Sequence, residues 1–290
     1  MKNTLALLLV LATLSLTAGD IHFVENGKSN YCIILPYKME SVEIRQHVTH
    51  AAKRLQEAFQ EATGAAIPIV SENHYDASKG PGIFLAQSDF MHAQGLNTDD
   101  YKGFDYLIAT RGKNIILSGA NRHSSGWRWQ KEYKFFTLGT VKAIVEFMRT
   151  YMHTEFLMPG VVGTSTPKAA DLTIPEDLTF KGHVKMKFGA GRNDELMYDY
   201  ANSNYGFGTV YHYGEHTYPQ AVKKSEYGEK HPEYFAMIRG KREVNLGHLC
   251  ISNPEVQELI YNNTLKHLDD GADVCELGQT DGYAQCTCPN

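Results

Sequence analysis

The chain has 290 residues, of which 42% are hydrophobic, 21% charged and 11% aromatic. This balance is typical of a globular protein and excludes the disordered, collagen-like and coiled-coil classes. The formal net charge of −5 gives no electrostatic support for nucleic-acid binding. At about 150 residues per domain, the length predicts two domains.

Residues 1–19 have the pattern of a secretory signal peptide. Lys2 precedes an apolar run at 5–16, and small residues follow as far as Gly19. The run is shorter than the roughly twenty residues that a membrane span needs. We therefore expect cleavage near Gly19 and an exported mature protein, periplasmic or extracellular, that does not span a membrane.

A small two-layer α/β domain is predicted over residues 20–180. Apolar residues recur with a helical period over 41–63, where Ser41 is the expected N-cap and Gly64 the expected end of a helix. The same period predicts a second helix over 139–152. Strands are expected at 66–70, 82–86, 106–109 and 114–117, with a hairpin turn at 111–113 between the last two.

The region from residue 181 onward is predicted to alternate strands and helices. Its clearest element is a helix that Asn253 caps and Gly271 ends. Strands at 249–251 and 273–277 flank this helix, which predicts a βαβ unit with parallel strands. The other expected elements are a helix at 194–201 and strands at 184–188 and 209–213.

Two parts of the chain resemble known families. Residues 139–160, with the motifs GTV, VEF and FLMPG, resemble the end of the N-terminal domain of secreted α-glucuronidases and family-20 β-hexosaminidases. The motifs HPEYFA, GKR, LCISNPEV and GQTDG, followed by Cys286-x-Cys288, resemble the domain of unknown function 4838 family. This resemblance covers essentially the whole mature chain. It implies a divergent bacterial glycoside hydrolase with a (β/α)₈ barrel.

The resemblance implies a TIM-like barrel, and a complete one needs about 250 residues. Residues 181–290 are enough for roughly four strands, so we expect the first half of a (β/α)₈ barrel, apparently truncated. The family usually has another cysteine after Cys288, which this sequence lacks. Any catalytic groups on later strands would be missing.

A (β/α)₈ barrel forms its site at the carboxyl ends of its strands, so the loops that follow the strands hold the candidates. Arg192, in the loop at 189–194, is a candidate for binding a sugar hydroxyl or carboxylate, with a solvated or helix-capping role as the alternative. His212 lies at the end of the next strand and His216 and Tyr218 follow it, where imidazoles can bond sugar hydroxyls and rings can stack on sugars. Metal binding by the two histidines and a structural role remain open.

The last predicted strand supplies two carboxylates, which glycoside hydrolysis usually requires. Asp281 is the predicted catalytic acid, although it could instead cap the turn at Gly282. Glu276 is expected to point into the barrel, where burial would let it hold a proton near neutrality. Gln279 and Asn253 are candidate substrate ligands, with helix capping as the alternative for Asn253. The hexosaminidases have an Asp-Glu pair at the equivalent strand end, so their substrate-assisted chemistry is not transferred to this chain.

The sequence has five cysteines, most of them near its C-terminal end. Cys286 and Cys288 are predicted to form a disulfide or to have another structural role, because export permits disulfides. A zinc site is the alternative, but it needs further ligands. Cys250 and Cys275 are placed on neighbouring strands and are expected to be buried free thiols, with a bridge between them as the other possibility.

These features favour an exported carbohydrate-active protein, a glycoside hydrolase that acts on a polysaccharide or oligosaccharide. No cofactor is expected, and the oligomeric state is left open. The alternative is a non-catalytic glycan-binding protein on a degenerate hydrolase scaffold, which the absence of the Asp-Glu pair favours. A metal-dependent hydrolase that uses the histidines and the cysteines is the third hypothesis.

Overall fold

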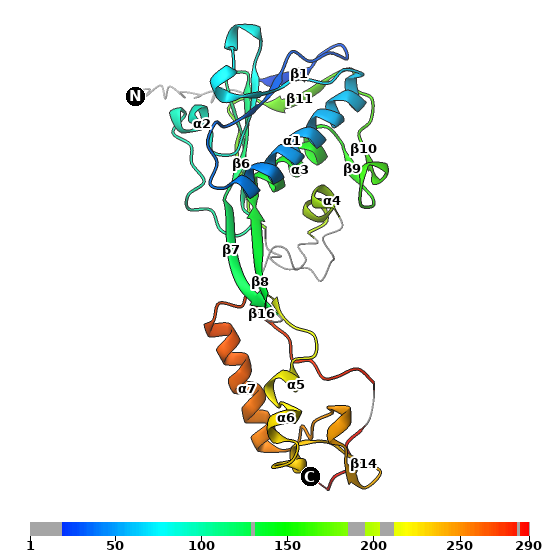
Figure 1. The fold of residues 1–290 in the computed structure, drawn as a ribbon. Coiled ribbons are helices and arrows are strands. Elements are labelled where there is room, and N and C mark those ends of the chain that lie inside the picture. The colour runs from blue at the N-terminus through cyan, green and yellow to red at the C-terminus, as the bar shows by residue number, and fades with distance from the viewer. Residues whose placement is uncertain (1–18, 129–130, 185–194, 204–211, 283–284, 290) are drawn as a thin grey trace, which may run out of the picture.

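The computed structural model describes residues 19–128, 131–184, 195–203, 212–282 and 285–289 (Figure 1). Nearly all of the predicted signal peptide and of the strand expected at 184–188 lie outside these residues. Among the described residues, no helix has both the length and the apolar character that a membrane crossing requires. The predicted mixed α/β class is confirmed.

The first part of the chain is organised around a six-stranded mixed sheet with the order β12-β5-β6-β4-β2-β3. β2, β3, β4 and β6 run parallel, and β5 is antiparallel to β6 and β12. Side chains alternate between the faces, so Ile83 and Ile115 enter one core cluster while Phe84 and Ile116 enter the other. The strands are β2 (Cys32–Leu35), β3 (Ile69–Ser71), β4 (Gly82–Leu85), β5 (Tyr106–Arg111), β6 (Asn114–Gly119) and β12 (Thr179–Gly182).

Two long helices, α1 (Val42–Thr63) and α3 (Gly139–Tyr151), cover one face of this sheet (Figure 1). Both were predicted from their apolar period. The Ser41 hydroxyl accepts the N–H of Ile44 at 3.1 Å, and Gly64 ends α1 in the left-handed conformation. The caps expected for the first helix are therefore confirmed.

A short antiparallel ribbon packs on the outer side of these helices. It consists of β1 (Asp20–Val24) and β11 (Leu172–Pro175). Phe23 of β1 contacts Phe59 of α1 and Phe147 of α3, with ring centroids 6.0 and 5.3 Å apart. The opposite face of the sheet is covered by the short helix α2 and its flanking loops. The helix α2 spans Asp89–Ala93, and two further short strands pair with each other, β9 (Glu155–Phe156) and β10 (Thr164–Ser165).

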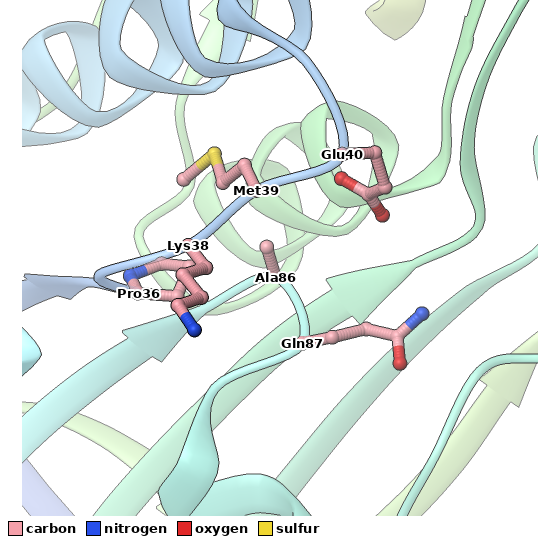
Figure 2. A pocket seen from close by; sticks show the side chains of 6 residues that line it. All are labelled: Pro36, Lys38, Met39, Glu40, Ala86 and Gln87. Carbon is pink, nitrogen blue, oxygen red and sulfur yellow. The ribbon is translucent and has the colours of Figure 1, made fainter.

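The strand order changes direction between β2 and β4. The chain leaves β2 toward β3 on one side and leaves β4 toward β5 and β6 on the other. In open α/β sheets, the carboxyl ends of strands at such a switch point form a crevice. A cavity of about 250 Å³ lies at this point (Figure 2).

A long hairpin, β7 (Asn121–Arg128) and β8 (Lys131–Leu138), extends away from the sheet (Figure 1). The sequence analysis did not predict these two strands. The hairpin returns directly into α3, where the Asn121 amide donates to the Thr140 hydroxyl at 2.9 Å. This bond ties the base of the hairpin to the first turn of α3.

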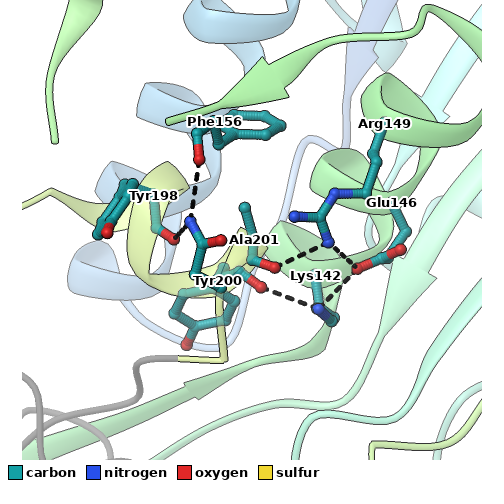
Figure 3. Close-up of polar contacts among 8 residues, drawn as sticks. Lys142, Glu146, Arg149, Phe156, Tyr198, Tyr200 and Ala201 are labelled. Atoms are coloured by element: carbon teal, nitrogen blue, oxygen red, sulfur yellow. Dashed lines mark hydrogen bonds and ion pairs between the residues drawn. The ribbon is translucent and has the colours of Figure 1, made fainter. Parts of the chain in front are cut away.

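The short helix α4 (Leu196–Ala201) is predicted correctly and packs against α3 and α1. Its last carbonyls are capped by cations of α3: Lys142 Nζ donates to Tyr200 O at 2.8 Å, and Arg149 donates to Ala201 O at 2.9 Å (Figure 3). Cations are favoured at a helix C-terminus because its carbonyls are unpaired and the helix dipole is negative there. Glu146 accepts from Lys142 at 2.7 Å, so the buried ammonium is paired as well as hydrogen-bonded.

The predicted domain boundary near residue 180 falls inside β12, which pairs with β5. The helix α4 also belongs to the first core cluster, through Met197 and Tyr200. The boundary itself stays a prediction.

The C-terminal part holds short strands and helices around a small apolar cluster (Figure 1). Its two main strands, β13 and β16, pair in parallel, and α7 precedes β16. Asn253 Oδ1 accepts the N–H of Glu255 at 2.9 Å and so caps α7 as expected. The elements are β13 (His212–Tyr213), α5 (Tyr218–Ala221), α6 (Lys224–Tyr227), β14 (Met237–Ile238), β15 (Lys241–Arg242), α7 (Pro254–Asp269) and β16 (Val274–Cys275).

The strand predicted at 249–251 is wrong. Leu249 makes a single antiparallel bridge to Phe235, and a turn follows directly. The N–H of Cys250 donates to Tyr234 O at 2.8 Å, which draws the chain into a loop rather than into the sheet. The parallel partner of β16 is therefore β13, and no closed barrel is present among the described residues.

We predict that Lys142→Met lowers the free energy of unfolding by about 2 kcal/mol, because it removes two charge-assisted hydrogen bonds from a buried site. Denaturant unfolding of the full chain measures this change. Lys53→Met on the exposed face of α1 is the control and should stay within about 0.5 kcal/mol of the parent. Equal stability of both variants would contradict the role of Lys142 in holding α4.

Candidate functional site

The parallel pair β13–β16 brings two loops to the same edge. His212 and Tyr213 pair with Val274 and Cys275, and the N–H of Glu276 continues the ladder to Tyr213 O at 2.8 Å. Because both strands run in the same direction, the loops at 214–218 and 277–281 leave at the same end. Four of the predicted site residues, His216, Tyr218, Gln279 and Asp281, lie on these two loops, while His212 and Glu276 lie at the strand ends themselves.

Glu276 bridges the two strands through its side chain. Its Oε1 atom lies 2.6 Å from His212 Nε2, and its Oε2 atom accepts the N–H of Glu215 at 2.9 Å. The His212 side chain is 1% exposed, whereas that of Glu276 is 47% exposed. The expectation that Glu276 is buried is therefore wrong: the carboxylate lies at the surface, with its inner oxygen against a buried imidazole.

A glycine makes this contact possible. A Cβ atom at Gly214 would lie 2.1 Å from His212 Cε1 and 2.9 Å from Glu276 Cδ, too close for either group to stay in place. Gly278 is restricted in the same way, since its Cβ would lie 1.9 Å from Glu215 O. Close approach of the two loops thus requires glycine at both positions.

Thr217 is a central residue of the site that the sequence analysis missed. Its buried hydroxyl donates to Glu276 O at 2.9 Å and accepts the N–H of Gly278 at 2.9 Å. The N–H of Tyr218 donates to Gly278 O at 2.9 Å. The two loops are therefore joined by backbone and hydroxyl bonds as well as by the Glu276 carboxylate. A threonine between His216 and Tyr218 gave no signal of this role.

His216 and Asp281 face each other across the same two loops. His216 Nδ1 lies 2.7 Å from Gln279 O, and its Nε2 atom lies 3.4 Å from Asp281 Oδ2. The hydrogen bond to the Gln279 carbonyl, and secondarily the Asp281 charge, raise the pKa of His216 above its usual value. The Asp281 side chain is 97% exposed, so this pair lies in contact with solvent.

The other predicted ligands lie apart from this group. The Tyr218 ring packs on the apolar cluster that contains Val222, and Asn253 caps α7. Arg192 lies outside the described residues. Instead, His248 approaches the site, with its Nδ1 atom 2.9 Å from the Thr280 hydroxyl. His248 was not predicted, because the loop that carries it was assigned no role.

The grouped side chains place the exposed His216 imidazole and two carboxylates, Glu276 and Asp281, at the same end of the two strands, with the His212 imidazole buried behind Glu276. Imidazole–carboxylate pairs can transfer protons, and both groups can bond the hydroxyls of a polar ligand. The raised pKa of His216 extends its protonated, hydrogen-bond-donating form to higher pH. The arrangement is therefore suited to an uncharged polyhydroxylated ligand or to proton transfer on one.

None of the five cysteines, all of which lie in the described residues, forms a disulfide, so no bridge joins Cys286 to Cys288. Cys250 lies beside them, with its Sγ atom 3.4 Å from that of Cys288. The expected proximity of Cys250 to Cys275 is wrong, because Cys250 is not on a strand next to β16. Cys275 Sγ instead points to Thr264 O of α7, 4.0 Å away.

The cavity between β2 and β4 is a second hollow that the sequence analysis missed. Ala86, directly after β4, has a φ of +56°, which a non-glycine residue rarely adopts. Backbone strain of this kind is concentrated at ligand sites. Nothing in the sequence around Ala86 indicated this left-handed conformation. The residues that line the cavity are Pro36, Lys38, Met39, Glu40, Ala86 and Gln87 (Figure 2).

The fold defines a mixed α/β protein whose C-terminal part has polar groups at the exits of parallel strands. Residues 158–290 match the model of a family described as a domain of unknown function, DUF4838. A search of curated proteins found no match for the chain.

We predict that Asp281→Asn lowers the pKa of His216, because it removes one of the charges that stabilise the imidazolium. NMR titration of the His216 ring measures the shift. In the parent, protonation of His216 stabilises the folded state. This contribution is fully present below about pH 6.5, the ordinary pKa of histidine, and is lost as the pH rises through the raised pKa of His216 in the folded chain.

The control for this titration is Asp171→Asn, which changes a carboxylate that bonds Asn26 in the first part of the chain. It should leave the His216 titration unchanged. An identical His216 pKa in the parent and in Asp281→Asn would show that the two side chains do not interact.

Proposed function

We propose that the protein is an exported glycoside hydrolase that acts on a polysaccharide or oligosaccharide. The observation that supports this proposal is the convergence of Glu276, Asp281, His212 and His216 at the exits of two parallel strands. Active sites of (β/α)₈ enzymes are built from loops in this position. Export is supported by the signal-peptide pattern of residues 1–19.

The parallel pair β13–β16 is proposed to be part of a (β/α)₈ barrel, with α7 as one of its outer helices. In support of this assignment, α7 leaves apolar side chains in solvent: Leu265 is 38% exposed and Leu268 is 44% exposed. Leu277, directly after β16, is 63% exposed. Further βα units of a barrel would cover such residues.

In this proposal Asp281 is the acid: it takes a proton from the neighbouring His216 imidazolium and passes it to the departing glycosidic oxygen. Glu276 is the second carboxylate. The N–H of Glu215 and the His212 ring hold the Glu276 carboxylate in a fixed orientation. His216 positions Asp281 through their 3.4 Å contact and can donate to a sugar hydroxyl when the ligand displaces part of that contact. Gln279 orients His216 through its carbonyl.

The second candidate function is glycan binding without hydrolysis. Asp281 is 97% exposed, so the protein surrounds this carboxylate with few groups that would shield a proton transfer from water. The cavity between β2 and β4 offers a separate, preformed hollow for a small polar ligand. Glycan binding with no release of reducing sugar would favour this candidate over the hydrolase.

We predict that Asp281→Asn and Glu276→Gln each lower glycan hydrolysis by about 100-fold or more, the usual effect of removing an acid–base group. The assay measures reducing-sugar release from a glycan panel by the full-length protein. Asp269→Asn at the exposed end of α7 is the matched control and should retain activity. Unchanged turnover in Asp281→Asn would remove this residue from the mechanism.

A further inference from the structure

Cys250 comes together with two cysteines that are distant from it in sequence, Cys286 and Cys288, beside the β14–β15 hairpin. The Sγ atoms of Cys250, Cys286 and Cys288 all lie within 4.8 Å of one another. In a tetrahedral zinc site with Zn–S bonds of about 2.3 Å, sulfur ligands lie about 3.8 Å apart. The three thiols therefore have the spacing of metal ligands without any change in the backbone.

The β14–β15 hairpin fixes the two C-terminal cysteines. The backbone N–H and the hydroxyl of Thr287 both donate to Met237 O, at 2.8 and 3.0 Å. The N–H of Met237 donates in return to Cys286 Sγ at 3.2 Å. Because Cys286 and Cys288 flank Thr287, these bonds hold both thiols next to Cys250.

A cation lies next to the three thiols. Arg242 pairs with Met237 in the hairpin, and its guanidinium donates to Phe235 O at 2.9 Å. The guanidinium also forms a hydrogen bond with Cys250. Three thiolates and a divalent ion carry a net charge of −1, which one guanidinium neutralises. A partly buried metal–thiolate group needs such compensation.

We propose that Cys250, Cys286 and Cys288 bind one Zn²⁺ ion as thiolates, and that this ion has a structural role. Each sulfur loses its proton to solvent when it binds the ion. Thiolate ligands favour zinc over magnesium or calcium, which prefer oxygen. Water or another small molecule is the fourth ligand. The Ser252 hydroxyl lies 3.5 Å from Cys250 Sγ, where it can form a hydrogen bond with that fourth ligand.

Beside the β14–β15 hairpin, the ion would join two segments: the loop before α7 and the chain after β16. The last of these segments also carries Asp281, five residues before Cys286. The site is separate from the catalytic proposal, since none of its ligands belongs to the group around Glu276. The competing state of the same sulfurs is a disulfide between Cys250 and Cys288.

The test uses the full chain, reduced with a non-thiol reductant and then loaded with Zn²⁺ alone or Co²⁺ alone. We expect one ion per chain by elemental analysis and a thiolate-to-cobalt charge-transfer band with the intensity of three sulfur ligands. Cys286→Ser and Cys288→Ser should each weaken Zn²⁺ binding at least tenfold. Cys275→Ser, a cysteine outside the cluster, is the matched control and should bind as the parent does.

Zn²⁺ binding by Cys288→Ser as tight as that of the parent would overturn the proposal. So would a parent that retains no ion after reduction, which would leave the disulfide as the function of these cysteines. If a serine variant does not fold, the cobalt spectrum of the parent decides alone, because a band with the intensity of one thiolate or none contradicts a three-thiolate site.

Discussion

The contact between His212 and Glu276 is the constraint on which the C-terminal part depends. β13 and β16 are each only two residues long, so few ladder bonds hold them together. The Glu276 carboxylate adds contacts to a buried ring on one side and to the Glu215 N–H on the other. In this way one side chain fixes both the parallel pair and the loops that carry the remaining polar groups.

The first part of the chain is stabilised in a different way. Its sheet buries both faces, and the alternation of apolar side chains supplies two core clusters that need no polar contact between strands. Polar contacts add to this at particular places, among them the carbonyl end of α4, which Lys142 and Arg149 cap. The C-terminal part has small apolar clusters, so its polar contacts determine its arrangement.

The sequence predicted the elements that local chemistry determines. Ser41 and Gly64 bound α1, and Asn253 caps α7, because capping depends on residues that are adjacent in the chain. The hairpin β7–β8 was not predicted, since its polar sequence lacks the alternation by which strands are recognised. The strand at 249–251 was predicted from three residues, too few to separate a strand from a loop that tertiary contacts hold.

The candidate site was predictable only in outline. That polar residues after β13 and β16 would meet followed from the parallel arrangement, but the partner of each side chain did not. The exposure of Glu276, the role of Thr217 and the position of Cys250 beside Cys288 all depend on contacts between segments more than thirty residues apart. No local pattern encodes which of these segments touch.

The most direct test of this account is a double-mutant cycle between His212 and Glu276. The free energy of unfolding is measured for His212→Ala, for Glu276→Ala and for the double variant. The account predicts a coupling energy of about 1 kcal/mol or more between the two side chains. Effects that add to within about 0.5 kcal/mol would show that the side chains act independently and that the strand exits are held together by something else.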